Sequence, residues 1–273
     1  GMAPSARVVP VDESPETALG TEAFHRRFAR VGRAWLRRLF RRELSTPASE
    51  DNMIDRLTVL ARYLARHPVR GGGELMRALT NRIRGRNPLK DEVPWMPFVA
   101  IDFLDQSLKS SMRVFEFGSG GSTLFLAKRA GQVVSVEHDS KWAELVSKEL
   151  VHRKVENVDF RCVPEEAGGD DRYASDVAGY RGKNFRRYVT TINEFSDESF
   201  DVIIVDGRAR NACVRAALPK VKPGGLLVLD NSERKKYRPA REFLARYPQR
   251  DFDGLNPYQI DPGRTTVWTI NHS

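Results

Sequence analysis

The sequence predicts an α/β fold, a doubly wound sheet of mostly parallel strands with an N-terminal helical extension. Two observations predict this class. Short apolar runs alternate with helical patterns from about residue 113 onward, which is the order of a parallel sheet covered by helices. A glycine or an acidic residue also stands at the end of four of these apolar runs, at Gly118, Glu137, Asp206 and Asp230. Because ligands of such sheets bind at the carboxyl ends of the strands, these four residues are expected to share one edge.

The expected elements follow from the spacing of apolar residues. Strands are expected at residues 113–117, 132–137, 157–162, 200–205, 225–230, 249–254 and 264–270. Helices are expected at residues 99–108, 122–130, 140–151, 209–219 and 236–246. The polar stretch 164–199 is too long for an ordinary connection. We expect it to form either a helix or flap near the site, or a surface insertion.

Three further helices are expected earlier in the chain, at residues 21–43, 49–67 and 74–84. The three glycines at 71–73 predict a break between the last two. The net charge of +9 is uneven: residues 1–90 carry 18 basic and 9 acidic side chains, and residues 91–273 carry 27 of each. This asymmetry predicts a basic helical extension (19–90) and a neutral ligand-binding domain (91–273). Residues 1–18 are rich in Pro, Ser and Glu and are expected to form a flexible N-terminus.

The basic helix at residues 21–43 has an apolar stripe that includes Phe24, Phe28 and Trp35, with arginines over much of the rest. The favoured interpretation is a helix packed on its own domain with a solvated arginine face. The alternative is peripheral contact with an anionic membrane surface. Because no recognition module accompanies the helix, no nucleic-acid partner is expected.

Size and composition exclude several other classes. With 273 residues the chain can bury one large core, and no apolar run approaches the roughly 20 residues of a membrane span. The N-terminus lacks the apolar segment of a signal peptide. The two cysteines, Cys162 and Cys213, are expected to be reduced and buried, and no Cys/His cluster suggests zinc. We therefore expect a cytoplasmic protein.

The most informative stretch runs from Val114 to Thr123. An apolar run that contains Glu116 breaks into Gly-Ser-Gly-Gly-Ser-Thr, and a helical pattern follows. Such a turn brings a ligand against bare backbone at a helix N-terminus, although it is also a common way to join a strand to a helix. The dinucleotide fingerprint G-x-G-x-x-G fails because Thr123 stands at the third glycine. Glu137, at the end of the next strand, can accept the hydroxyl groups of a ribose.

These pieces together resemble the class I S-adenosylmethionine-dependent methyltransferases. The resemblance consists of E-x-G-x-G at 116–120, the acidic strand end at Glu137, the V-D-G-R segment at 205–208, and the L-P-K-V-K-P-G-G stretch that leads to Asp230-Asn231. It covers roughly residues 92–270. A group of bacterial predicted methyltransferases is similar in the G-S-G-x-S-T turn and in the tail at 256–268 as well. The resemblance implies a Rossmann-like methyltransferase sheet and identifies residues 91–273 as an S-adenosylmethionine-binding domain.

The resemblance also implies the residues of the cofactor site. Glu116 and the turn from Gly118 to Gly120 would hold the amino-acid end of S-adenosylmethionine, and Glu137 would hold its ribose. The full set expected at the cofactor is Glu116, Phe117, Gly118, Ser119, Gly120, Gly121, Ser122, Thr123, Glu137, His138, Trp142, Val163, Glu165 and Asp206.

Asp206 is the expected catalytic residue. Asp206, Asp230 and Asn231 resemble the oxygen ligands of catechol-type O-methyltransferases, in which Mg²⁺ lowers the pKa of the acceptor hydroxyl. The match has a gap, because Arg208 and Arg210 follow Asp206 where those enzymes place a lysine base. An arginine is a poor base but can bind an acidic acceptor. Alternatively, Asp230 and Asn231 form only a strand-ending turn.

The predicted function is methyl transfer to oxygen of a small-molecule or saccharide-like acceptor. Aromatic residues expected near the acceptor, or alternatively only packed in the core, are Trp95, Phe98, Tyr237 and Tyr258. One alternative is a non-catalytic scaffold that binds the cofactor and docks to a membrane or partner through residues 21–43. Another is a nicotinamide-dependent oxidoreductase, which Thr123 disfavours.

Overall fold

The computed structural model describes residues 48–168, 170–175, 178–180 and 182–272. The predicted flexible N-terminus and the predicted basic helix at 21–43 lie outside the described residues. The chain divides into two compact units, residues 1–56 and residues 57–273. This division falls earlier than the boundary predicted near residue 90. In the described residues, no helix has the length and hydropathy of a membrane span.

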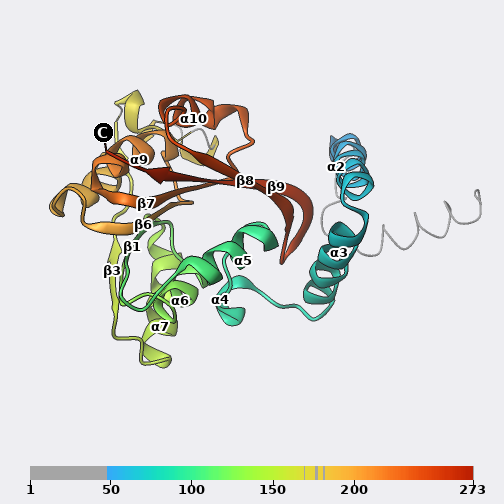
Figure 1. Ribbon diagram of the computed structural model, residues 1–273, viewed down its shortest axis with the longest axis horizontal. Coiled ribbons are helices and arrows are strands. Elements are labelled where there is room, and N and C mark those ends of the chain that lie inside the picture. Colours follow the sequence, from blue (N-terminus) through green and yellow to red (C-terminus); the bar gives the residue numbers. More distant parts are fainter. Residues whose placement is uncertain (1–47, 169, 176–177, 181, 273) are drawn as a thin grey trace, which may run out of the picture. The chain divides into compact units, whose positions relative to one another are not determined.

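A seven-stranded sheet forms the centre of the second unit (Figure 1). Its strands are β1 (Arg113–Phe117), β2 (Gln132–Glu137), β3 (Val158–Cys162), β6 (Phe200–Val205), β7 (Val221–Asp230), β8 (Gln249–Asn256) and β9 (Gln259–Ile270). Their order is β3-β2-β1-β6-β7-β9-β8, with β1, β2, β3, β6 and β7 parallel and β9 antiparallel to β7 and β8. The predicted α/β class is confirmed, and the parallel strands all end at one edge.

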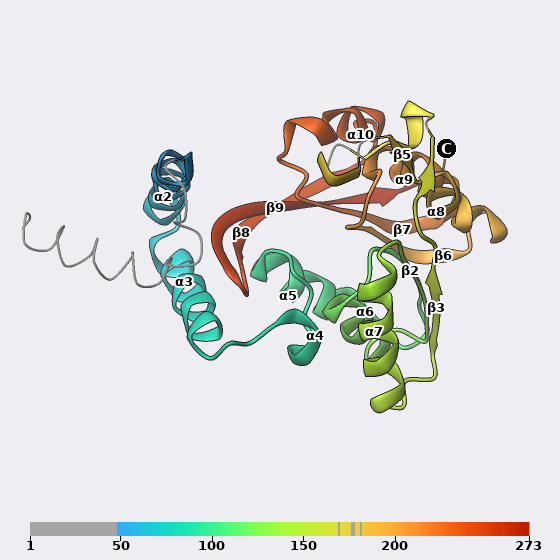
Figure 2. The ribbon, with the colours of Figure 1, turned by 180° about the vertical axis from the view of Figure 1, so that it is seen from behind.

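Helices cover both faces of this sheet (Figure 2). On one side lie α5 (Phe98–Ser107) and α6 (Gly121–Ala127), and on the other lie α9 (Arg210–Ala217) and α10 (Arg238–Phe243). The connection from β2 to β3 contains α7 (Ser140–His152). Successive side chains of a strand point to opposite faces, so each strand contributes to two cores. Val114 joins the cluster under α5 and α6, while Phe115 joins the cluster under α9.

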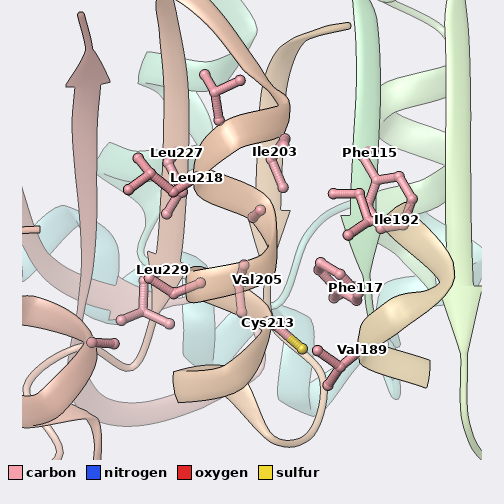
Figure 3. Packing of buried hydrophobic residues seen from close by; sticks show 14 of the residues in the cluster. Phe115, Phe117, Val189, Ile192, Ile203, Val205, Cys213, Leu218, Leu227 and Leu229 are labelled. Carbon is pink, nitrogen blue, oxygen red and sulfur yellow. The ribbon is translucent and has the colours of Figure 1, made fainter. Parts of the chain in front are cut away.

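The larger core explains part of the polar stretch 164–199. This stretch contains β4 (Glu166–Ala167), β5 (Lys183–Asn184), α8 (Arg186–Thr190) and short 3-10 turns. Val189 and Ile192 point toward Phe115 and Phe117 of β1 and are almost wholly buried (Figure 3). The second half of the stretch is therefore part of the domain core and not only a surface insertion.

Two N-terminal helices are described, α2 (Ala48–Arg66) and α3 (Pro68–Ile83). The break predicted at residues 71–73 is wrong, because these glycines lie inside α3. The chain instead turns at His67, and Pro68 starts α3 with the fixed φ that suits a first helical position. A Cβ at Gly71 would lie 3.1 Å from side-chain atoms of Tyr63 and Leu64, so glycine allows the two helices to pack closely.

A buried carboxylate joins α3 to the sheet. Glu74 is 4% exposed and accepts hydrogen bonds from the hydroxyl of Tyr63 at 2.6 Å and from the backbone N–H of Leu255 in β8 at 2.9 Å. Removing a donor would leave a buried carboxylate without its partner, which is costly. Glu74 therefore fixes α3 to β8 within the second unit.

Candidate active site

A crevice of about 310 Å³ lies at the carboxyl ends of β1, β2 and β6. This is the edge that the sequence predicts for ligand binding. The crevice is lined by Gly118, Ser119, Glu137, His138, Asp139, Trp142, Tyr180, Asp206, Gly207 and Arg208. Six of these belong to the predicted cofactor set: Gly118, Ser119, Glu137, His138, Trp142 and Asp206.

The turn after β1 requires glycine at its first position. Gly118 has φ of 94°, in the region that L side chains rarely adopt, and its N–H donates to the carbonyl of Val136 at 2.9 Å. A Cβ at Gly118 would lie 2.9 Å from backbone atoms of Gly207. The loops after β1 and β6 therefore touch through their backbones, which brings both strand ends to the same crevice.

Glu116 does not reach the crevice, contrary to the expectation that it holds the amino-acid end of the cofactor. Its side chain is fully buried, and its Oε2 accepts hydrogen bonds from Thr123 Oγ1 and Ser135 Oγ, each at 2.7 Å. Thr123 Oγ1 in turn accepts the N–H of Gly120 at 3.0 Å. Burial raises the pKa of Glu116 to about 7. Glu116 therefore supports the glycine turn from below, and Thr123 is a link in that support.

The other predicted turn residues also lie away from the crevice walls. Phe117 is buried in the core beside Phe115. A Cβ at Gly121 would collide with the backbone carbonyl oxygens of Pro88 and Val93, so this glycine lets α6 begin against α4 (Pro88–Asp91). Gly121 therefore has a packing role in the structure. The sequence motif alone fits either packing or contact with the cofactor. Gly120, Ser122 and Thr123 are likewise absent from the crevice lining.

Glu137 is held by four donors of the protein. Its Oε1 accepts the backbone N–H groups of His138 at 2.8 Å and Asp139 at 2.9 Å. Its Oε2 accepts the N–H and the hydroxyl of Ser119, both at 2.9 Å. Burial alone would raise the pKa of Glu137, but these bonds and the nearby His138 ring outweigh it and hold the pKa below its ordinary value. A charged, fixed carboxylate therefore stands at the end of β2.

A histidine and a tyrosine form the neighbouring wall. His138 Nδ1 lies 2.7 Å from Glu137 Oε1, and its Nε2 lies 3.0 Å from the hydroxyl of Tyr180. The guanidinium carbon of Arg208 lies 5.4 Å from the Tyr180 ring centroid. Neither Tyr180 nor Arg208 belongs to the predicted cofactor set. The aromatic content of stretch 164–199 and the V-D-G-R segment are the sequence signals that point to them.

Of the other residues predicted to contact the cofactor, Trp142 lines the crevice, whereas Val163 and Glu165 do not. Trp142 Nε1 donates to the carbonyl of Ser119 at 2.9 Å, so the indole braces the glycine turn while lining the crevice. Val163 packs half-buried against the main core. Glu165 is paired with Lys183 at 2.5 Å.

An arginine occupies the space between the two strand-ending aspartates. Arg210 Nη2 lies 2.7 Å from Asp206 Oδ1, and its Nη1 lies 4.0 Å from Asp230 Oδ2. Its Nε also donates to the carbonyl of Gly207 at 3.0 Å. Asp230 is 1% exposed and accepts the hydroxyl of Thr265 at 2.6 Å. Burial, followed by the charge of Asp206, raises the pKa of Asp230 to about 8.

The residues predicted to bind Mg²⁺ do not fit that ion. A divalent ion at Asp206 and Asp230 would have to stand beside the guanidinium of Arg210, which would repel it and which already pairs with Asp206. The raised pKa of Asp230 also favours a protonated carboxyl group, whereas a metal ligand must be deprotonated. Asn231 adopts φ of 50°, as expected of a strand-ending turn. Within the described ranges, no group of three or more His, Cys, Asp or Glu could hold a metal ion.

Comparison with known proteins identifies the domain. Residues 115–232 match the family model for a methyltransferase domain, which spans the glycine turn, Glu137 and both strand-ending aspartates. Residues 115–232 thus form a methyltransferase domain. The predicted resemblance and the predicted enzyme class are thereby confirmed. No curated protein sequence matches this methyltransferase.

Several solved structures are similar to this chain. An O-methyltransferase from Bacillus cereus in complex with S-adenosylhomocysteine is 17% identical, with 77% of this chain and 96% of that chain covered and a TM-score of 0.50. Cofactor-bound Rv0187 from MTB is 18% identical (78% and 97% covered, TM-score 0.49). A methyltransferase-like protein from Silicibacter pomeroyi is 24% identical (65% and 89% covered, TM-score 0.45). At these identities the likeness concerns the fold.

Proposed function

We propose that this methyltransferase transfers a methyl group to an oxygen atom of a small hydroxylated acceptor, with the cofactor held in the 310 Å³ crevice. The observation that carries the proposal is the meeting of three features in that crevice. The glycine turn at Gly118, the charged carboxylate of Glu137 and the carboxylate of Asp206 all line it. The similar solved structures include an enzyme described as an O-methyltransferase.

The crevice residues fit the cofactor chemically. Backbone groups at Gly118 and Ser119 would face its amino-acid end, and Glu137 would accept ribose hydroxyl groups. When bound, S-adenosylmethionine would supply an electrophilic methyl carbon to the acceptor oxygen and would leave as the neutral thioether, so the acceptor would have to give up its hydroxyl proton. His138 and Tyr180 would close the adjoining wall and exclude water.

Asp206 is the group proposed to take the acceptor proton. Its side chain is 27% exposed and lines the crevice, whereas that of Asp230 is buried behind it. Burial raises the pKa of Asp206, although Arg210 opposes the rise, so its carboxylate is a stronger base than that of an exposed aspartate. Arg210 would hold Asp206 in a single orientation.

The proposal is tested in two steps. Calorimetry with S-adenosylmethionine, S-adenosylhomocysteine and NAD tests the crevice: the two adenosyl ligands should bind to the wild type and bind at least tenfold more weakly to Glu137→Gln. A labelled-methyl screen of hydroxylated metabolites and sugars then tests the reaction, with Asp206→Asn as the inactive variant. Binding of NAD alone, or unchanged binding by Glu137→Gln, would contradict the cofactor assignment.

Peripheral membrane contact through residues 21–43 remains a separate proposal. It is supported by the aromatic stripe and the arginines of that segment. Binding to anionic vesicles should weaken when residues 1–45 are removed, and equal binding by both proteins would refute it.

A further inference from the structure

A second and larger cavity adjoins the crevice. Its volume is about 640 Å³, and Arg208 lines both cavities. The walls come from residues 171–175, from α8 and the turn after it, from α9, and from the turn before α10. The cavity therefore extends from the end of β6, where Asp206 stands, along the groove between α8 and α9.

The charge of this cavity is strongly one-sided. Its described lining contains one acidic side chain, Asp171, and the basic side chains of Arg172, Arg208, Arg210, Arg215 and Lys236. Two of these cations are already neutralised within the protein. Arg172 pairs with Asp170 at 2.6 Å, and Arg210 pairs with Asp206 at 2.7 Å.

The remaining three cations have no carboxylate partner among the residues that the structure describes. Arg208 Nε is buried and makes no hydrogen bond there. Arg215 lies over the ring of Phe243 at 4.5 Å, and Lys236 Nζ lies 5.0 Å from the ring centroid of Tyr237. An aromatic face positions a cation but accepts little from its N–H groups, so these donors remain available to a ligand.

The rest of the lining combines apolar side chains and two tyrosine rings with the polar side chains of Ser175, Thr190, Asn193 and Asn211. Val189, Ala212, Ala216 and Pro219 contribute to one stretch of the wall, and the rings of Tyr173 and Tyr237 contribute elsewhere. A ligand that fits this surface has an apolar or ring-shaped body together with a group that can pair with guanidinium and ammonium ions. Carboxylate and phosphate are the groups that such cations bind best.

We propose that the 640 Å³ cavity binds the methyl acceptor through Arg208, Arg215 and Lys236, and that the acceptor therefore carries a carboxylate or phosphate group. The inference rests on the proposed function, because Arg208 connects this cavity to the crevice in which methyl transfer would occur. It makes an acidic hydroxylated compound a better acceptor than a neutral sugar.

Calorimetric titration of the full chain at low ionic strength tests the inference. The probes are inorganic phosphate and benzoate, with benzyl alcohol as the uncharged ring control. The wild type should bind at least one of the two anions saturably, and which of them binds distinguishes a phosphate-bearing from a carboxylate-bearing acceptor. The double variant Arg208→Gln/Lys236→Gln should bind that anion at least tenfold more weakly.

Lys235→Gln is the matched control, because it removes the same charge one residue away from Lys236 and does not line the cavity. It should bind the anion within twofold of the wild type. The single variant Lys236→Gln, in a partly exposed position, replaces the double variant if the latter does not fold. Absence of saturable binding of both anions, or equal weakening by Lys235→Gln and Lys236→Gln, would overturn the inference.

Titration of the same proteins with S-adenosylhomocysteine separates this inference from the proposed function. Lys236→Gln should bind that ligand like the wild type. An anion site without S-adenosylhomocysteine binding would refute the cofactor assignment alone, and S-adenosylhomocysteine binding without an anion site would refute the present inference alone.

Discussion

Arg210 and Asp206 form an ion pair of 2.7 Å at the carboxyl end of β6, and the arginine is almost wholly buried. The guanidinium also faces Asp230 at the end of β7 and donates to the backbone carbonyl of Gly207. A side chain of the protein thus supplies the positive charge that two converging aspartates require. This relationship has consequences for metal dependence, stability and pH dependence.

Metal removal should leave the cofactor site intact. Because Arg210 already pairs with Asp206 and lies 4.0 Å from Asp230, dialysis against EDTA is expected to change the affinity for S-adenosylhomocysteine by less than twofold. Once an acceptor is known, the rate of methyl transfer should be equally insensitive. Loss of binding or activity that added Mg²⁺ restores would contradict the role assigned to Arg210.

Removing the guanidinium should destabilise the protein strongly. Arg210→Met leaves Asp206 without its ion-pair partner and is expected to lower the free energy of unfolding by about 3–5 kcal/mol. Urea unfolding measures this. The control is Arg238→Met, which breaks an exposed pair with Glu242 and should cost no more than about 1 kcal/mol. Similar losses of unfolding free energy in both variants would show that the buried ion pair stabilises the protein no more than the exposed pair does.

The stability of the wild type should depend on Asp230 between about pH 4 and pH 8. The pKa of Asp230 rises from 3.8 to about 8 in the folded protein, so the folded state holds a proton there that the unfolded state has lost. Protonated Asp230 therefore makes its full contribution to the free energy of unfolding below pH 4. The free energy of unfolding then falls as the pH rises to 8, by on the order of 1 kcal/mol per pH unit. Urea unfolding at several pH values measures this dependence. In Asp230→Asn the free energy of unfolding should decline less steeply with pH than in the wild type. An identical slope in both proteins would contradict the raised pKa.

Ser119 and Glu137 should have opposite effects on cofactor binding. The four lone-pair positions of Glu137 are filled by protein donors, so a ribose hydroxyl must displace one of them, and the rotatable hydroxyl of Ser119 is the easiest to displace. Ser119→Ala is therefore expected to bind S-adenosylhomocysteine as well as the wild type or up to about tenfold more tightly. Glu137→Gln should bind it at least tenfold more weakly. A tenfold loss in Ser119→Ala would show that its hydroxyl contacts the cofactor instead.

The contact between the loops after β1 and β6 can be tested at Gly118. Gly118→Ala introduces strain at positive φ and forces a methyl group against Gly207. Gly224→Ala is a matched control, because Gly224 also has positive φ but open space around its Cα. The control should lose about 1–2 kcal/mol of unfolding free energy, and Gly118→Ala should lose more and bind S-adenosylhomocysteine more weakly. Equal losses of unfolding free energy in Gly118→Ala and Gly224→Ala would mean that the contact between the two loops does not stabilise the protein.

Local patterns predicted most of the sheet. The strands that begin near Arg113, Gln132 and Phe200 lie within a residue or two of the expected ranges, because each is a short apolar run bounded by polar or turn residues. The break expected at Gly71 was wrong because close packing against Tyr63 stabilises a helical glycine there. That packing depends on a neighbouring helix and is invisible in the local pattern.

The site was predicted less completely. Glu137 and Asp206 were recognisable because they end strands, and strand ends of a parallel sheet converge. Glu116 was assigned to the cofactor because it precedes the glycine turn, whereas its side chain points into the core. Tyr180 lines the crevice but lies in the stretch 164–199, where apolar residues show no helical or strand periodicity. Its position therefore cannot be derived from the sequence pattern alone.

Local sequence patterns predict the order of strands and helices, the glycine turn and the expected ligand-binding edge of the sheet, because each depends on residues close together in the chain. The tertiary structure alone decided what stands between Asp206 and Asp230. An arginine four residues after an aspartate can face solvent, an acceptor or that carboxylate, and its sequence position does not show that it also approaches Asp230. The parallel pairing of β6 with β7 brings Asp206 and Asp230 to the same edge, and Arg210 turns inward because buried carboxylates need a cation close by.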